Sequence, residues 1–384
     1  MTTELTRMAR ADDAVRRFEA AAVQMNSLRV VTPDDLPGHR ERFVRDWERG
    51  RPRDPHFTYQ EAPDDGLRAA TALLTDIKRL TDPWHRLVQD EAHNAVELFR
   101  ACADHDSDRI TGLTVRANGR PDAALLTEAH AVLSPHQGTA DTDVGGLDAA
   151  SAASVLTEIL DACGLSDWTV LIKADMAARM SVLAARRQIN LRSDLLVSVE
   201  GLVHLTMHEI GTHVFRSVNA RRGPRILHLR LPGHTATEEG LAVWHEQTVA
   251  GATNVDPRFA LRVIAVHRAL TGSFTEVVTD LLPHTGLRTA FDVAVRVKRG
   301  LTDTSAPGGY LKDHAYLAGY RMIRSHLEQF PQNYPTLMST KWPLRLVESL
   351  TMAGLPAALP GPLLLPDTEL AQYVRSLAEE AAAG

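Results

Sequence analysis

Apolar residues recur at three- and four-residue spacing over most of the N-terminal third of the chain. The pattern covers residues 11–23, 66–80 and 84–103, and this spacing is typical of amphipathic helices. The stretches between them contain Pro, Asp and Gly, which favour loops. The sequence therefore predicts a helical N-terminal region over residues 1–135.

The periodicity changes after a polar segment, residues 134–146, which is rich in Gly, Asp and Thr and is the expected boundary or mobile loop. The next pattern predicts a helix over residues 148–163. It ends at Gly164, because glycine is typical just beyond a helix C-terminus. Two short β-branched stretches, residues 168–173 and 188–191, predict strands.

Helical spacing returns over residues 198–218 and 235–250, and it dominates again after residue 257. Between these helices, residues 225–231 alternate apolar and basic side chains and predict a strand. The whole pattern predicts a helix-rich α+β fold with a small mixed sheet near the centre of the chain. Residues 147–384 are expected to form the second, larger domain.

Composition narrows the classes of function. The 384 residues carry a formal net charge of −6, which disfavours a nucleic-acid partner. Two distant cysteines, Cys102 and Cys163, make no disulfide framework and no CxxC zinc site. We find neither a signal peptide nor an apolar run long enough for a membrane, so we expect a cytoplasmic protein. The preference for Ala and Arg over Lys suggests a bacterial chain.

The candidate chemistry lies in one predicted helix, which carries His204, His208, Glu209 and His213 within ten residues. Zinc prefers imidazole and carboxylate ligands. His204 and His208 are four residues apart and share a helix face, whereas His208 and His213 would diverge by about 140° on an ideal helix. Spacing alone therefore favours the first pair.

The pair His208 and His213 belongs to an HExxxH pattern, one residue longer than HExxH. A π-bulge can absorb an extra residue, and Gly211 lies in the spacer, where backbone distortion costs least. In HExxH the glutamate after the first histidine is the base that acts on water, a role that would fall to Glu209. The alternative is a helix with a few hydrogen-bonded histidines on its polar face, but the density of these residues favours a metal site.

A third ligand is expected from the next helix. Thr235 and Glu238 fit a capping box, which gives Glu238 a structural role and leaves Glu239 free to face the metal. The alternative for Glu239 is a favourable interaction of an acidic residue with the helix dipole. Glu246, seven residues further on, lies on the same face and is the substitute candidate.

The sequence from His208 to His213, HEIGTH, followed by EGLA at Glu239, resembles the family that includes the microtubule-associated tyrosine carboxypeptidases. Bacterial members are often called QEGLA-motif proteins. The resemblance extends over residues 168–320 and implies a zinc metallopeptidase-like, zincin-like core. It implies His208, His213 and Glu239 as ligands of Zn²⁺ and Glu209 as the general base.

The resemblance also bears on the neighbouring candidates. The bacterial motif has Gln where this chain has Glu238, which agrees with a structural role for Glu238, and it selects His213 over His204. A further segment, KDHAYLAG from Lys312, is similar to the family's KDxxYxxG pattern. It suggests Tyr316, or else His314, as the hydrogen-bond donor to the developing oxyanion; the alternative is a tyrosine packed on the core.

Four cations are candidates to bind a substrate carboxylate. Arg216 follows His213 by three residues and is the first choice, because a guanidinium binds a carboxylate bidentately; alternatively it pairs with a nearby acid. Lys173 and Arg179 are weaker candidates, and Lys312 either binds substrate or forms an ion pair with Asp313.

The expected activity is that of a zinc carboxypeptidase acting on the C-terminus of a peptide or protein. A zinc endopeptidase or amidohydrolase, or a non-catalytic regulatory protein with a structural zinc, are the alternatives. For a bacterial chain the resemblance transfers the class of reaction but no particular substrate.

Overall fold

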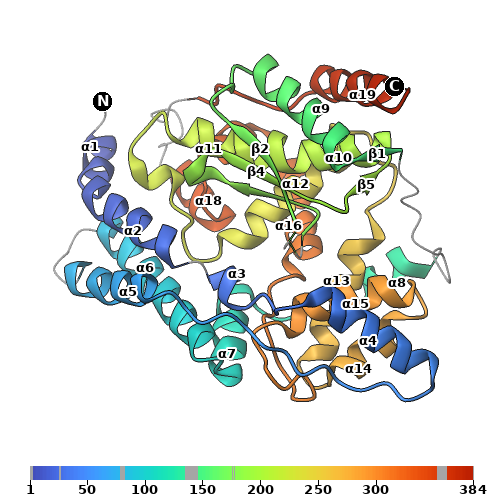
Figure 1. Ribbon diagram of the computed structural model, residues 1–384. Coiled ribbons are helices and arrows are strands. Elements are labelled where there is room, and N and C mark those ends of the chain that lie inside the picture. The colour runs from blue at the N-terminus through green and yellow to red at the C-terminus, as the bar shows by residue number, and fades with distance from the viewer. Residues whose placement is uncertain are drawn as a thin grey trace.

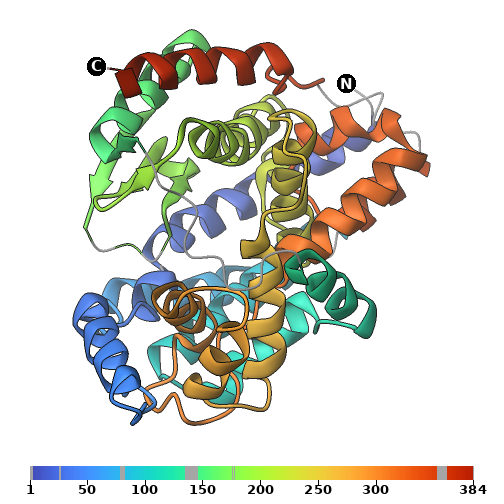
Figure 2. The same cartoon turned by 90° about the vertical axis from the view of Figure 1, so that its right-hand side faces the viewer.

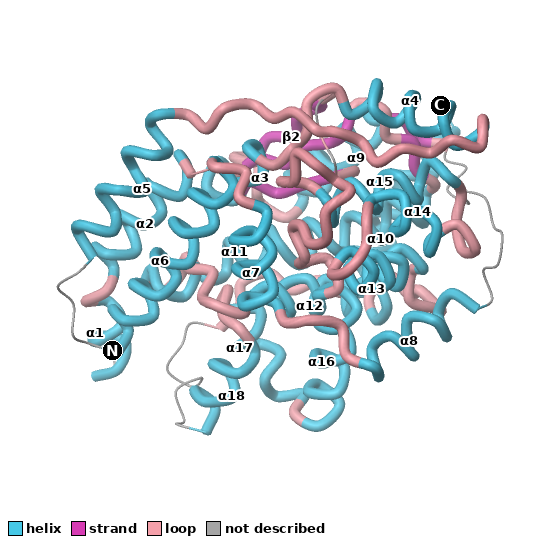
Figure 3. Tube along the Cα trace, turned by 90° about the horizontal axis from the view of Figure 1, so that it is seen from below, coloured by secondary structure: helices cyan, strands magenta, loops and turns pink. Residues whose placement is uncertain are grey.

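The computed structural model describes residues 3–25, 27–77, 83–134, 146–174, 176, 178–352 and 361–383. Over these residues the chain is helix-rich α+β with small sheets, as the sequence predicts, and strands form a minor part of it (Figures 1 and 3). The polar segment expected as a boundary lies, apart from its two ends, outside the described residues. The division into two domains and the zincin-like character of the core therefore stay predictions.

The strands form a mixed three-stranded sheet and a two-stranded one. β2 (Thr169–Lys173) pairs in parallel with β4 (Gln188–Arg192), and β3 (Met180–Leu183) pairs antiparallel with the other side of β4. β1 (Leu147–Asp148) pairs antiparallel with β5 (Leu196–Val197). The two predicted strands are confirmed as β2 and β4, whereas the sequence pattern did not predict β3.

A first hydrophobic core lies against the larger sheet and gathers helices from both ends of the chain (Figure 1). Ile189 and Leu191 of β4 are fully buried in this core, and so are Leu156 and Ile159 of α9 (Ala149–Ala162). Its helices are α1 (Thr3–Ala9), α2 (Asp12–Gln24), α3 (Ser27–Val30), α5 (Asp64–Ile77), α6 (Pro83–Ala103), α7 (Ser107–Asn118), α9 (Ala149–Ala162), α10 (Val199–His208), α11 (Phe215–Ala220), α17 (Tyr334–Ser339), α18 (Leu344–Met352) and α19 (Thr368–Ala383). The three helices predicted in the N-terminal third are confirmed as α2, α5 and α6.

A second hydrophobic core lies below the first in the view of Figure 2. At its centre Phe43, Phe274 and Phe291 pack edge to face or tilted, with ring centroids 5.2–5.4 Å apart. Its helices are α4 (Leu36–Glu48), α8 (Ala123–Leu133), α13 (Pro257–Ala269), α14 (Phe274–Leu281), α15 (Leu287–Lys298) and α16 (Ala315–Gln329). The N-terminal helices thus contribute to both cores.

One helix pair joins the two cores. α12 (His234–Thr248) buries Leu241 in the first core and Val243 in the second, and α16 likewise spans both. The two helices cross at Gly240 and Gly319, where a Cβ on Gly240 would lie 2.1 Å from the carbonyl carbon of Gly319. Because the backbones touch, the crossing accepts no larger residue, and it fixes the distance between α12 and α16.

Two predictions of local structure are wrong. The expected strand over residues 225–231 is a 3₁₀ helix, Arg225–His228, followed by non-helical chain. Both Ile226 and Leu227 are buried, which an alternating strand with one solvent face does not allow. The expected capping box is absent as well, since α12 begins after Gly233, which offers no side-chain cap. By contrast, the helix predicted to end at Gly164 is confirmed as α9, with Gly164 at φ +71°.

The remaining short helices are 3₁₀ segments at Ala184–Arg186 and Pro331–Asn333. Among the helices that the structure describes, none is both long enough and apolar enough to cross a membrane.

The crossing of α12 and α16 gives a direct test. We expect Gly240→Ala to destabilise the fold by about 1–3 kcal/mol, because the added methyl group has to push two backbones apart. The matched control is Gly112→Ala within α7, where a Cβ meets nothing within 4 Å. That change should leave stability unchanged or raise it slightly. Urea unfolding of both variants measures the difference, and equal stabilities would contradict the close-contact interpretation.

Candidate metal centre

The helix that carries the HExxxH pattern is distorted at the predicted place. α10 ends at His208, a π-helical turn covers Glu209–Val214, and α11 begins at Phe215. The wider turn brings residues five apart onto one face, so the rings of His208 and His213 lie 5.1 Å apart. The predicted π-bulge is therefore confirmed.

A buried hydrogen-bond chain holds this turn. The hydroxyl of Thr212 donates to the carbonyl of Met207, five residues earlier, at 3.1 Å. It also accepts from Nδ1 of His245 at 2.7 Å, and Nε2 of His245 accepts from the hydroxyl of Tyr334 at 2.9 Å. Burial lowers the pKa of His245 to about 3, so this imidazole is neutral and can serve as donor and acceptor at once.

Gly211 has a different role from the expected one. A Cβ at this position would lie 3.0 Å from Cβ of Pro366, so the glycine makes room for a segment that packs against the π-helical turn. Gly211 does not have a positive φ, so its backbone conformation does not require glycine. The close approach of Pro366 is what favours a residue without a side chain here.

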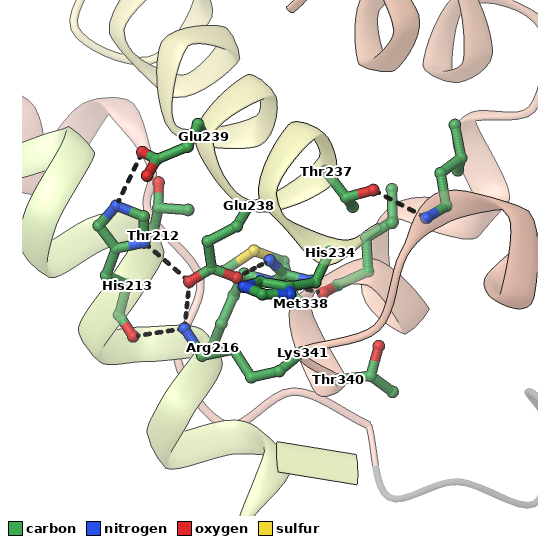
Figure 4. Close-up of polar contacts among 12 residues, drawn as sticks. Thr212, His213, Arg216, His234, Thr237, Glu238, Glu239, Met338, Thr340 and Lys341 are labelled. Atoms are coloured by element: carbon green, nitrogen blue, oxygen red, sulfur yellow. Dashed lines mark hydrogen bonds and ion pairs between the residues drawn. The ribbon is translucent and has the colours of Figure 1, made fainter. Parts of the chain in front are cut away.

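Three candidate ligand atoms converge between α12 and the π-helical turn. Oε2 of Glu239 lies 3.5 Å from Nε2 of His208. The same oxygen lies 3.6 Å from Nε2 of His213 (Figure 4). These three atoms lie within 4.8 Å of one another. Ligands bound to zinc at about 2.1 Å in a tetrahedron are about 3.4 Å apart, so the spacing fits a zinc ion.

The Glu239 oxygen also fits this interpretation chemically. Oε2 of Glu239 is buried and, among the described residues, has no hydrogen-bond partner. A buried carboxylate oxygen without a partner is costly unless a cation satisfies it. The residues present therefore fit a zinc ion held by His208, His213 and Glu239.

Each histidine is oriented by a second glutamate of α12. Nδ1 of His208 donates to Oε1 of Glu246 at 2.6 Å. Nδ1 of His213 donates to Oε1 of Glu238 at 2.8 Å (Figure 4). These bonds place the proton on Nδ1 and turn Nε2 toward the centre, as in carboxylate–histidine–zinc arrangements. Glu246, the substitute ligand candidate, thus lies behind His208 rather than beside the other ligand atoms.

Glu238 is itself held by two buried cations, Arg216 and Lys341 (Figure 4). Lys341 also donates to the carbonyl of His213 at 3.1 Å, and Nε of Arg216 donates to the carbonyl of Leu337 at 2.9 Å. Burial raises the pKa of Glu238, but the two cations outweigh it and hold that pKa well below its usual value. Glu238 therefore connects His213 to a buried charge network.

The expected substrate-binding role of Arg216 is wrong for the same reason. Its side chain is 0% exposed and its guanidinium forms an ion pair with Glu238. A carboxylate from a substrate cannot reach it without displacing Glu238.

The residues around the candidate ligands favour a positive charge between them. Burial lowers the pKa of His208, but the nearby carboxylates of Glu239 and Glu246 outweigh it and raise that pKa to about 10. The pKa of His213 is raised in the same way, against burial, by Glu238 and Glu239. The surrounding carboxylates thus stabilise a cation here, which either protons or a divalent metal ion can supply.

The two proposed catalytic side chains interact with residues of this centre. Glu209 is 9% exposed, and burial raises the pKa of its carboxyl, with further contributions from Glu239 and Glu246. The ring of Tyr316 stacks 6.0 Å from the ring of His208, at an interplanar angle of 20°. Burial first, and then Glu239, raise the pKa of Tyr316, so its hydroxyl keeps its proton.

The structure separates the remaining candidates. Lys312 lies near the site, with Nζ 5.8 Å from the centroid of the Tyr316 ring. His314 faces away, because its Nε2 donates to the carbonyl of Asn118 at 3.0 Å. Lys173 is exposed on β2 and lines a cavity of about 510 Å³ that includes none of the three ligand residues. His204 is outside the ligand group.

Sequence reasoning missed Lys341 and the pairing of Glu246 with His208. Lys341 is 103 residues from Glu238, and no motif or spacing connects the two. The position of Glu246 on the same face as Glu239 was a usable signal, but it did not reveal the contact with His208.

Comparison with known proteins identifies the relationship. The model of the microtubule-associated tyrosine carboxypeptidase family matches residues 41–368. The chain belongs to this family. The match includes the π-helical turn, α12 and α16, and it extends into the N-terminal helices beyond the region where motifs showed the resemblance.

Individual relatives match over shorter segments. Microtubule-associated tyrosine carboxypeptidase 1 of Mus musculus is 37% identical over 150 residues, which is 36% of this chain and 32% of the relative. The Homo sapiens protein of the same name is 35% identical over 162 residues, or 39% of this chain and 34% of the relative. The matched segment thus spans about a third of the length of these curated relatives.

The buried network predicts the consequence of removing one charge. Glu238→Gln should lower the free energy of unfolding by about 3–5 kcal/mol, because Arg216 and Lys341 would remain buried without their partner. Glu379→Gln, at an exposed position of α19, is the control and should change stability by less than about 0.5 kcal/mol. Urea unfolding of metal-free protein measures both. A Glu238 variant as stable as the control would disprove the network's importance.

Proposed function

We propose that this protein is a zinc-dependent carboxypeptidase that removes the C-terminal residue of a peptide or protein. The observation that carries the proposal is the convergence of ligand atoms from His208, His213 and Glu239. Membership in the microtubule-associated tyrosine carboxypeptidase family supports the class of reaction. The names of the relatives make a C-terminal tyrosine the first substrate to test.

The ligand set supports a catalytic rather than a structural zinc. Two imidazoles and one carboxylate provide three protein ligands, and catalytic zinc sites keep the fourth position open. Within the described residues, the group of convergent ligand atoms contains no fourth side chain. A structural zinc, by contrast, has four protein ligands.

The chemistry is divided between the metal and two side chains. When bound, the zinc ion supplies Lewis-acid chemistry that polarises a peptide carbonyl and acidifies water. Glu209 accepts the proton of the attacking water and delivers it to the leaving amine. Tyr316, whose hydroxyl is protonated at neutral pH, donates a hydrogen bond to the developing oxyanion. Lys312, whose Nζ lies 5.8 Å from the centroid of the Tyr316 ring, contributes a positive charge toward the substrate.

Metal analysis tests the ligand set. We expect purified protein to bind about one zinc ion per chain, and His213→Ala to lose it, because two ligands do not hold zinc tightly. The matched control is His204→Ala, which removes a histidine from the same helix outside the ligand group and should keep the metal. Elemental analysis and calorimetric titration with zinc measure both variants. If the His204 variant loses zinc and the His213 variant keeps it, the ligand pair is His204 and His208 rather than His208 and His213.

Substitution of the proposed base separates metal binding from catalysis. Glu209→Gln should retain zinc but lower kcat by about 10²–10⁴-fold, because the amide cannot accept the proton of water. The assay is the release of tyrosine from a tetra-alanyl-tyrosine peptide. Undiminished hydrolysis by this variant would exclude Glu209 as the general base.

A further inference from the structure

Beside the metal centre, on the side of the second core, four cations surround one carboxylate. We call Arg262, Arg296, Arg299 and Lys312 the cation cluster, and Asp313 is the acid at its centre. Arg262 belongs to α13, Arg296 to α15, and Lys312 to the segment before α16. Asp313 is 0% exposed, and Arg299 is 6% exposed, so the cluster lies within the protein rather than on a solvated face.

The positive charge of this cluster is not balanced. Asp313 forms ion pairs with Arg296 and, at 3.7 Å, with Lys312. The neighbouring acid on this side, Asp256, is already paired with Arg258 at 2.6 Å. Within the described part of the chain, the guanidinium of Arg262 forms no ion pair and its Nη1 is buried without a hydrogen-bond partner.

The same is true of the neighbouring arginine. Nε of Arg299 is buried without a hydrogen-bond partner among the described residues, and its guanidinium lies over the ring of Tyr310 at 4.7 Å. Buried cationic donors without partners are costly, and a carboxylate is the acceptor that best satisfies them. The cluster therefore has the composition of an anion site.

Its position relative to the metal centre is equally specific. The guanidinium of Arg262 lies 4.2 Å from the centroid of the Tyr316 ring. The Tyr316 ring in turn stacks 6.0 Å from the ring of His208, one of the three candidate ligands. The ring of Tyr316 thus contacts both a candidate zinc ligand and a member of the cation cluster.

We propose that Arg262, assisted by Lys312, binds the free α-carboxylate of the substrate and so makes the enzyme a carboxypeptidase. The inference rests on the proposed peptidase function. Successive carbonyl carbons of a peptide are less than about 4 Å apart, so the α-carboxylate must be held within one residue of the scissile bond. Arg262 contacts the ring that stacks on His208, and it offers the bidentate geometry that carboxylates favour. It takes the role that the sequence suggested for Arg216.

Binding measurements test the proposal independently of turnover. The probes are the tetra-alanyl-tyrosine peptide with a free C-terminus and the same peptide with a C-terminal amide, titrated into the zinc-loaded Glu209→Gln protein. We expect the free acid to bind about 10- to 100-fold more tightly than the amide. Adding the substitution Arg262→Gln should abolish this preference, because it weakens binding of the free-acid peptide and leaves binding of the amide unchanged. If the variant retains the preference, Arg262 does not bind the carboxylate.

A matched substitution and chemical rescue exclude a general structural effect. Arg268→Gln changes an arginine of the same helix that pairs with Glu276 at 2.9 Å, and it should leave both peptides unaffected. In protein with Glu209 intact, Arg262→Ala should raise KM for the free acid more than it lowers kcat, and millimolar guanidinium should restore part of the loss. Equal weakening of acid and amide, with no rescue, would reveal a structural role and overturn the proposal.

The two proposals fail in different ways. In one outcome, the protein binds the free acid more tightly than the amide and this preference depends on Arg262, but the protein with Glu209 intact hydrolyses neither peptide. That result would support the carboxylate subsite and overturn the proposed peptidase activity. Hydrolysis of both peptides at equal rates would support the peptidase and overturn the subsite.

Discussion

The π-helical turn between α10 and α11 is the constraint on which the site depends. On a regular helix His208 and His213 would point in different directions and could not share an ion. The added width of the turn is held from inside by Thr212, which bonds to the carbonyl of Met207, and from outside by Pro366, which packs on Gly211. The distortion that the ligand spacing requires is thus built into the packing of the first core.

The second helix of the site, α12, completes this arrangement through three glutamates with different roles. Glu239 reaches both histidines at Nε2, whereas Glu238 and Glu246 each hold one histidine at Nδ1. Adjacent residues on a helix point in directions about 100° apart, which lets Glu238 bond behind His213 while Glu239 faces the centre. The buried cations Arg216 and Lys341 hold Glu238 in place. The orientation of His213 therefore depends on two charged residues that are not ligands themselves.

The site lies where the two hydrophobic cores meet. The first core supplies the histidines, and α12 crosses between the cores and contacts α16 through Gly240 and Gly319. α16 also carries Tyr316, whose ring lies near both His208 and Arg262. The result is a site with several carboxylates around the two histidines and several guanidinium groups near the ring of Tyr316. This arrangement of charges suits a metal ion near the carboxylates and the C-terminal carboxylate of a peptide substrate near the guanidinium groups.

The sequence by itself determined the features that depend on neighbours along the chain. The five-residue spacing of His208 and His213 required a π-bulge, β-branched runs predicted β2 and β4, and Gly164 marked the end of α9. Helical periodicity also predicted most helices, because burial of one face repeats every three or four residues. These are local constraints, and a short window of residues contains them.

Only the tertiary structure decided the features that depend on which elements pack together. Glu238 proved to be the partner of His213 and of Lys341, 103 residues away, instead of a capping residue. The closeness of Arg216 to His213 in sequence suggested a role in substrate binding. Its burial in an ion pair with Glu238 excludes that role. Residues 225–231 show the alternation of a strand, but the adjacent residues Ile226 and Leu227 are both buried. In each case the environment of a side chain comes from helices distant in sequence, and no local pattern records it.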